Sequence, residues 1–157
     1  MRPTSLPYLA CIAFLAMAHD ATGGEAWTLD SRTAGNTKSC SLSRTDEGPI
    51  LSVTLTVPPG ATDQGVVGLT FDAPKLIGHA AKTLATLQFD NGTTESHRIE
   101  ATPAGLLIPI VALDLDEVLQ TFAVSRKLTV TTRSGSRSLD LEGIGARIPA
   151  LRACAGG

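Results

Sequence analysis

This sequence has little net charge, few cysteines and no apolar run long enough to cross a membrane. Lysine and arginine together number 13 against 15 acidic residues, so the formal net charge is −2. A mildly acidic chain with scattered basic residues lacks the electrostatic footprint of a nucleic-acid-binding protein. The basic residues that do cluster are typical of the solvent side of strands; they are Arg126, Lys127, Arg133 and Arg137. We therefore predict no nucleic-acid partner.

The residue patterns of common catalytic sites are also missing. There is no Gly-x-Ser-x-Gly sequence, and the segment Ser134-Gly135-Ser136 consists of ordinary turn residues between two expected strands. The acidic group Asp114, Asp116 and Glu117 lacks the glycine and distal glutamate of a calcium loop. Capping of a helix that follows Asp114 accounts for all three carboxylates. We therefore predict that the protein is not an enzyme.

A metal or cofactor site is not indicated either. The three histidines are His19, His79 and His97, and none has another histidine or a cysteine at the spacing of zinc ligands. A histidine at a processed N-terminus can bind metal loosely without any selected site. The expected metal and cofactor content is none.

The N-terminus has the features of an export signal. Arg2 is the only charge before Asp20, and an apolar stretch of about 13 residues spans 6–18, shorter than the roughly 20 residues of a membrane-spanning helix. It ends in Ala16-Met17-Ala18, a match to the small-residue pattern that signal peptidase recognises. The alternative site after Ala26 lies far past the apolar run. Lipidation at Cys11 would split that run, and Tyr8 stands where a lipoprotein signal has leucine.

Removal of residues 1–18 leaves a domain, residues 19–157, with two cysteines. These are Cys40 and Cys154, which are not a Cys-x-x-Cys pair. In an exported protein such a pair more often forms a structural bond than a reactive site. Since only one intramolecular connection is available, we predict a disulfide between Cys40 and Cys154.

Apolar residues along this domain alternate, as in half-buried strands. The clearest example is 50–57, where Leu51, Val53, Leu55 and Val57 share one face. Pro58-Pro59-Gly60 ends that strand. Other expected strands are 26–29, 38–43, 66–71, 84–89, 93–99, 106–111, 127–132 and 137–141. In 106–111, Pro109 requires an edge position or a bulge.

Two further patterns place a turn and two helices. Asn91-Gly92 predicts a hairpin turn with both residues at the central positions, where φ is positive. Asp114 predicts a helix N-cap, followed by apolar residues at one-face spacing. A last short helix is expected over 149–153, with Pro149 in its first turn.

The order of motifs from Leu87 to Cys154 resembles the invasion-associated locus B family of small exported bacterial proteins. The resemblance is carried by Phe-Asp-Asn-Gly at 89–92, Gly143, and Ala-Leu-Arg-Ala-Cys at 150–154, with Trp27 upstream of Cys40. Ile144-Gly145 and Pro149 depart from the pattern of the family. The resemblance implies a β-rich domain in the periplasm of a Gram-negative bacterium or secreted from it. It implies no catalytic residues, and a link to host-cell invasion only for some members.

These observations together predict one all-β domain with antiparallel strands, a sandwich or partly closed barrel with one or two short helices. The expected function is that of a non-catalytic exported interaction or envelope protein, with an unknown protein or envelope partner and a role in host association. The alternative is a periplasmic carrier of a small molecule or lipid, which would need a cavity between the sheets. A deep apolar pocket favours the carrier, and a flat exposed apolar patch favours the interaction protein.

The processing site can be tested directly. We expect the exported protein to begin at His19, because Ala16 and Ala18 fit the small pockets of signal peptidase. N-terminal sequencing of the exported form measures this. A chain retained in the membrane, or one modified at Cys11, would contradict the assignment.

Overall fold

The computed structural model describes residues 26–44 and 50–156. The predicted signal peptide, its cleavage site, Cys11 and His19 lie outside these residues. The described chain is mostly antiparallel sheet with two short α-helices, which confirms the predicted all-β class. Its elements are β1 (Thr28–Ala34), β2 (Thr37–Arg44), β3 (Leu51–Thr56), β4 (Gly65–Phe71), η1 (Pro74–Leu76), β5 (Lys82–Phe89), β6 (Thr94–Thr102), β7 (Gly105–Ala112), α1 (Leu115–Val124), β8 (Lys127–Thr132), β9 (Gly135–Asp140), η2 (Ile144–Ala146) and α2 (Ile148–Gly156).

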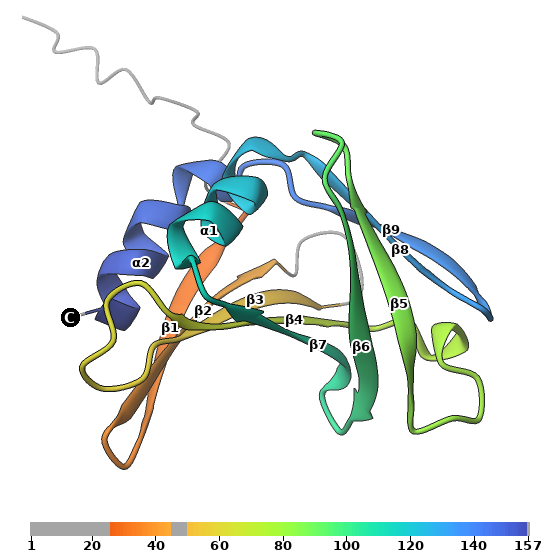
Figure 1. Ribbon diagram of the computed structural model, residues 1–157, viewed down its shortest axis with the longest axis horizontal. Helices are drawn as coiled ribbons and strands as arrows, with labels where there is room; N and C mark the ends of the chain where they lie inside the picture. Colours follow the sequence, from red (N-terminus) through yellow and green to blue (C-terminus); the bar gives the residue numbers. More distant parts are fainter. Residues whose placement is uncertain (1–25, 45–49, 157) are drawn as a thin grey trace, which may run out of the picture.

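The nine strands form one sheet in the order β1-β2-β3-β4-β7-β6-β5-β8-β9. Strands β5, β6, β8 and β9 run steeply across the direction of β1 to β4 and β7 (Figure 1). The sheet is not closed, and the inward side chains of both halves belong to one apolar core, as in a sandwich. The helices α1 and α2 lie together at one end of the molecule (Figure 1), where α2 packs on β2 and β3.

Alternation along β3 shows how the sequence positions this core. Leu51, Val53 and Leu55 are buried, while the hydroxyl residues between them face outward and are half-buried. Successive strand residues point to opposite faces, so the alternation commits one face of the strand to the core. Strand β7 shows the same pattern, with Leu106, Ile108, Ile110 and Ala112 buried.

Pro109 explains where the sheet changes direction. Strand β7 pairs with β4 from Leu106 to Ala112, but its ladder with β6 contains only Gly105, Leu106 and Leu107. In an antiparallel ladder, hydrogen-bonded positions on one side recur at every second residue. The next such position toward β6 after Leu107 is Pro109, which has no N–H to donate. The two strands therefore separate beyond Leu107, in agreement with the predicted edge position of Pro109.

The first hairpin was only partly predicted. The sequence indicated a short strand over 26–29, whereas β1 extends over Thr28–Ala34 and joins β2 through a turn in which Gly35 has φ of 60°. Nearly every residue of β1 is exposed. An edge strand that buries neither face leaves no apolar alternation in the sequence.

The β5–β6 hairpin corrects the predicted turn. Asp90 and Asn91, not Asn91 and Gly92, are the central residues, because the Gly92 N–H donates to the Phe89 carbonyl at 3.1 Å. Gly92 follows them with φ of 96°, and no other residue type has positive φ in the described chain. This is a type I turn closed by a left-handed glycine. The carboxylate of Asp90 accepts the Arg126 N–H at 3.1 Å, and this bond holds the turn against the start of β8.

The helix predictions are confirmed. The Asp114 carboxylate accepts the Glu117 N–H at 3.1 Å and caps α1. Its buried residues Leu115, Leu119 and Phe122 recur on one face, and the Phe122 ring meets Phe89 edge to face. The final helix α2 starts at Ile148, so Pro149 lies in the first turn, where its missing N–H costs nothing.

Because Gly92 has a positive φ, we predict that Gly92→Val destabilises the protein. A β-branched residue is strained at positive φ, so the free energy of unfolding should fall by about 1 kcal/mol or more. A side chain at this position has no atom within 4 Å to contact, so strain rather than a clash is measured. Chemical denaturation gives the value, with Gly92→Asn as the control, since asparagine tolerates this region better. An unchanged midpoint for Gly92→Val would mean that the turn is wrongly assigned.

Candidate functional site

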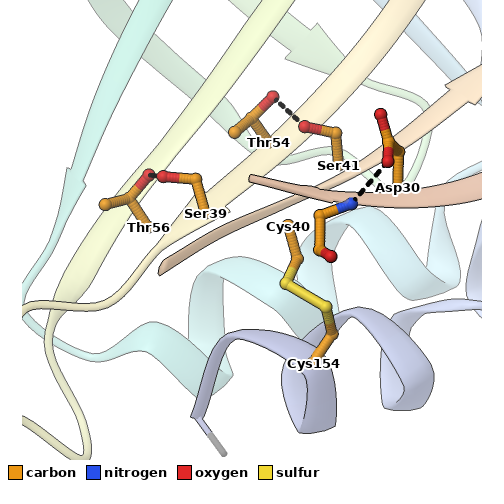
Figure 2. Close-up of a disulfide and its surroundings, with 8 residues drawn as sticks. Asp30, Ser39, Cys40, Ser41, Thr54, Thr56 and Cys154 are labelled. Atoms are coloured by element: carbon orange, nitrogen blue, oxygen red, sulfur yellow. Dashed lines mark hydrogen bonds between the residues drawn. A yellow bond between two sulfur atoms is a disulfide. The ribbon is translucent and has the colours of Figure 1, made fainter. Parts of the chain in front are cut away.

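The two cysteines singled out in the sequence join β2 to α2. Cys40 and Cys154 form a disulfide with their Cα atoms 6.1 Å apart, across 114 positions of sequence. Figure 2 shows Cys40 pointing from the strand toward the helix that carries Cys154. Cys40 is fully buried, and Cys154 packs against the core. The bond therefore fixes the last helix over the core face of the sheet.

Further contacts close the same end of the molecule. The indole N–H of Trp27 donates to the Glu142 carbonyl at 2.8 Å, which links the start of β1 to the segment after β9. Arg44, at the end of β2, forms an ion pair of 2.9 Å with Asp140 at the end of β9. Arg152 of α2 donates to the Thr62 carbonyl and lies 3.4 Å from the Asp116 carboxylate of α1. The first two contacts join the β1–β2 end of the sheet to the β9 end, and Arg152 ties α2 to α1 and to the segment between β3 and β4.

The opposite side of the sheet presents a surface without charge. It consists of the outward side chains of β2, β3, β4 and β7, which we call the uncharged face. Its residues are Thr37, Ser39, Ser41, Ser43, Ser52, Thr54, Thr56, Val66, Gly68, Thr70, Leu107, Pro109 and Val111. The strand registers place these residues beside one another across the four strands.

Hydroxyl groups on the uncharged face are paired with each other. The side-chain oxygens of Ser39 and Thr56 lie 2.8 Å apart, and those of Ser41 and Thr54 also 2.8 Å apart. Figure 2 shows both pairs on the side of the sheet away from the disulfide. A third pair joins Ser43 to a serine of β3 at 3.2 Å. Hydroxyl groups that already have partners lose less on desolvation than free ones, so a binding partner can cover them at low cost.

Beside the hydroxyl pairs lies an exposed apolar patch. Val66 and Val111 are cross-strand partners, 36% and 70% exposed, and Leu113, just past the end of β7, is 77% exposed. Charged residues begin only at the margins of the uncharged face, with Asp30 and Arg32 on β1. A charge-poor centre with a charged rim is the composition of a protein interface.

The other candidate residues have structural surroundings. His97 bonds to the Glu95 carboxylate at 2.6 Å, and both belong to β6. Ser134 lies in the β8–β9 turn and donates its N–H to the Thr132 hydroxyl at 3.1 Å. Over residues 26–44 and 50–156, no three His, Cys, Asp or Glu side chains gather as metal ligands would. The absence of a catalytic or metal site stays a prediction.

A groove lies at the far end of the sheet from the helices. Its volume is about 780 Å³, and its walls come from the segment after β4 and the β6–β7 turn, including Ile77, His79, Thr102 and Leu106. This volume falls within the range of small-molecule sites. The interior between the sheet halves is instead occupied by buried side chains of the core.

Sequence reasoning missed the uncharged face, although part of its pattern was visible. Ser and Thr alternate with apolar residues in β2 and β3, and no charge interrupts the outward positions. The pairing of β4 with β7 could not be seen, because partners such as Val66 and Val111 lie 45 positions apart in the sequence. Only the fold places the apolar patch beside the hydroxyl pairs.

The disulfide yields a stability prediction. The double variant Cys40→Ser and Cys154→Ser should lose about 2 to 5 kcal/mol of unfolding free energy, because a long closed loop is released in the unfolded chain. Denaturant unfolding measures the loss, and the reduced wild-type protein, which keeps both side chains, serves as the matched control. Mass mapping without reductant should find one peptide pair linking the two cysteines. Two free thiols in the exported protein, or a dimer linked through either cysteine, would contradict the bond.

Among the described residues, no helix has the length and apolarity to cross a membrane. Comparisons with protein-family models, with curated proteins and with solved structures found no match to this chain.

Proposed function

We propose that this chain is a non-catalytic exported protein of the bacterial envelope that binds a protein partner through the uncharged face. The observation that carries the proposal is the composition of that face, which combines paired hydroxyls with the exposed side chains of Val66 and Val111, next to the exposed Leu113. An exposed apolar patch of this kind marks an interaction surface more often than it marks an ordinary surface.

The disulfide supports an exported location within this proposal. Structural disulfides persist in oxidising compartments and are rare in the cytosol. The Cys40–Cys154 bond and the export features of residues 1–18 are independent observations that agree. We place the protein in the periplasm of a Gram-negative bacterium or outside the cell, as a relative of the invasion-associated locus B family with a role in host association.

A carrier of a small molecule or lipid is the second candidate, supported by the groove of about 780 Å³ at the end of the sheet. The core occupies the interior that a carrier of the expected type would use, so a ligand would bind at this groove instead. Native mass spectrometry of the exported protein distinguishes the two, since a carrier retains a small-molecule ligand and the interaction protein does not.

The proposed interface can be tested with Val66→Lys. A lysine beside Val111 on the uncharged face must be desolvated on binding, so capture of the partner should fall at least about tenfold. The measurement is quantitative mass spectrometry of proteins that are crosslinked to the exported protein in its native envelope. The matched control is Leu84→Lys, because Leu84 is 70% exposed but lies on β5, outside the face.

Two results would contradict the interface. The first is equal loss of the captured protein in Val66→Lys and Leu84→Lys, which would show a general effect of added charge. The second is unchanged capture in Val66→Lys, which would place the binding surface elsewhere.

A further inference from the structure

One side of strand β7 has backbone groups without a strand partner. Toward β4, the ladder of β7 reaches Ala112, but toward β6 it ends at Leu107. Because hydrogen-bonded positions alternate along an antiparallel strand, Pro109 and Val111 direct their backbone groups to the β6 side. The described structure therefore leaves the carbonyls of Pro109 and Val111, and the Val111 N–H, outside any ladder.

The direction of these groups follows from one hydrogen bond and one register pair on the neighbouring strand β6. The Ala101 N–H donates to the Ala81 carbonyl at 3.0 Å, so Ala101 bonds away from β7. Its neighbour Glu100 then bonds toward β7, where its register partner is Leu107. Since positions that bond to the same side recur at every second residue, the backbone groups of Pro109 and Val111 point to the same side as those of Leu107. This result uses only backbone bonds and not the exposure of side chains.

This segment differs from the two terminal strands of the sheet. Strand β1 carries Asp30 and Arg32, and β9 carries Arg137 and Asp140. Charged side chains on an edge strand discourage the addition of another strand. Pro109 and Val111 carry no charge, and the side chain of Val111 is 70% exposed. Pro109 protects this edge at one position, because it has no N–H to offer, but Val111 keeps both of its backbone groups and carries no charge.

We infer that the β7 edge from Pro109 to Val111 accepts an extended peptide segment of the partner protein, which adds to the sheet as a strand. The inference rests on the proposed interaction function and specifies its partner. Two carbonyl acceptors at two-residue spacing, with the Val111 N–H as donor, match the main chain of an extended peptide. The added strand would continue the uncharged face, so its outward residues should be uncharged and rich in Ser, Thr and Val.

The premise about the edge is tested first, on the full exported protein alone. Amide hydrogen exchange followed by NMR should show rapid exchange at Val111 and protection at Ile110, which bonds to β4 through the pair Val67–Ile110. Protection of both amides in the free protein would overturn the inference, since the edge would then already be occupied.

The binding test uses a displayed library of random ten-residue peptides and the purified exported protein. Selected peptides should be low in charge, and adding one should protect the Val111 amide from exchange. Val111→Pro removes the N–H that the edge from Pro109 to Val111 offers and no ladder bond with β4, so the dissociation constant should rise at least about tenfold. Val111→Thr is the matched control, because it also changes the exposed side chain but keeps the N–H; its dissociation constant should rise clearly less than that of Val111→Pro.

Each remaining result separates this inference from the proposed function. Equal weakening by Val111→Pro and Val111→Thr would overturn strand addition and leave the uncharged face as a side-chain interface. If no peptide is selected, strand addition at the β7 edge is also wrong. Loss of partner capture in Val66→Lys would still support the uncharged face as the binding surface. Thermal melting shows whether Val111→Pro folds. If this variant does not fold, the inference is tested by hydrogen exchange at Val111 in the wild-type protein, measured with and without a selected peptide. If the wild-type protein forms dimers and Val111→Pro does not, the strand that adds to this edge comes from a second copy of this chain and not from a partner protein.

Discussion

The course of the sheet depends on one missing hydrogen-bond donor. Pro109 stands where β7 would next bond to β6, and their ladder ends one step earlier, at Leu107. The same proline leaves the other side of β7 intact, because its register with β4 continues to Ala112. One residue thus lets a single sheet divide into two halves that share a core, while each half keeps its own ladder.

A sheet that opens in this way has to be held at its free ends. Side chains from distant parts of the sequence do so, through the Cys40–Cys154 bond, the Trp27 indole and the Arg44–Asp140 ion pair. The ion pair is partly exposed, with Asp140 at 55%, so it contributes little to stability. The disulfide and the buried tryptophan contribute most at this end, since one restricts the unfolded chain and the other buries a large apolar surface.

The two faces of β2 and β3 have different tasks. The core face is closed by α2 and the disulfide, which leaves no access from that side (Figure 2). The outward face carries hydroxyl pairs that satisfy one another and continues into the apolar patch around Val66 and Val111. The proposed binding function uses the face that the helices do not cover, and the unpaired edge of β7 borders it.

The sequence by itself determined the fold class, the Asp114 cap, the position of the last helix and the cysteine pair. Each of these depends on local periodicity, on a capping residue, or on a count that allows one solution. It also indicated that Pro109 requires an edge position or a bulge, because proline lacks an N–H in any context.

Only the tertiary structure decided the other features. The central residues of the β5–β6 turn depend on Asp90, whose carboxylate bonds to the Arg126 backbone, a contact that the local sequence does not contain. The length of β1 depends on pairing with β2, since its exposed residues carry no apolar pattern. The uncharged face depends on β4 lying beside β7, two strands that are separated in sequence by the β5–β6 hairpin. Strand order is a non-local property, because it is set by how the whole chain buries its apolar faces at once.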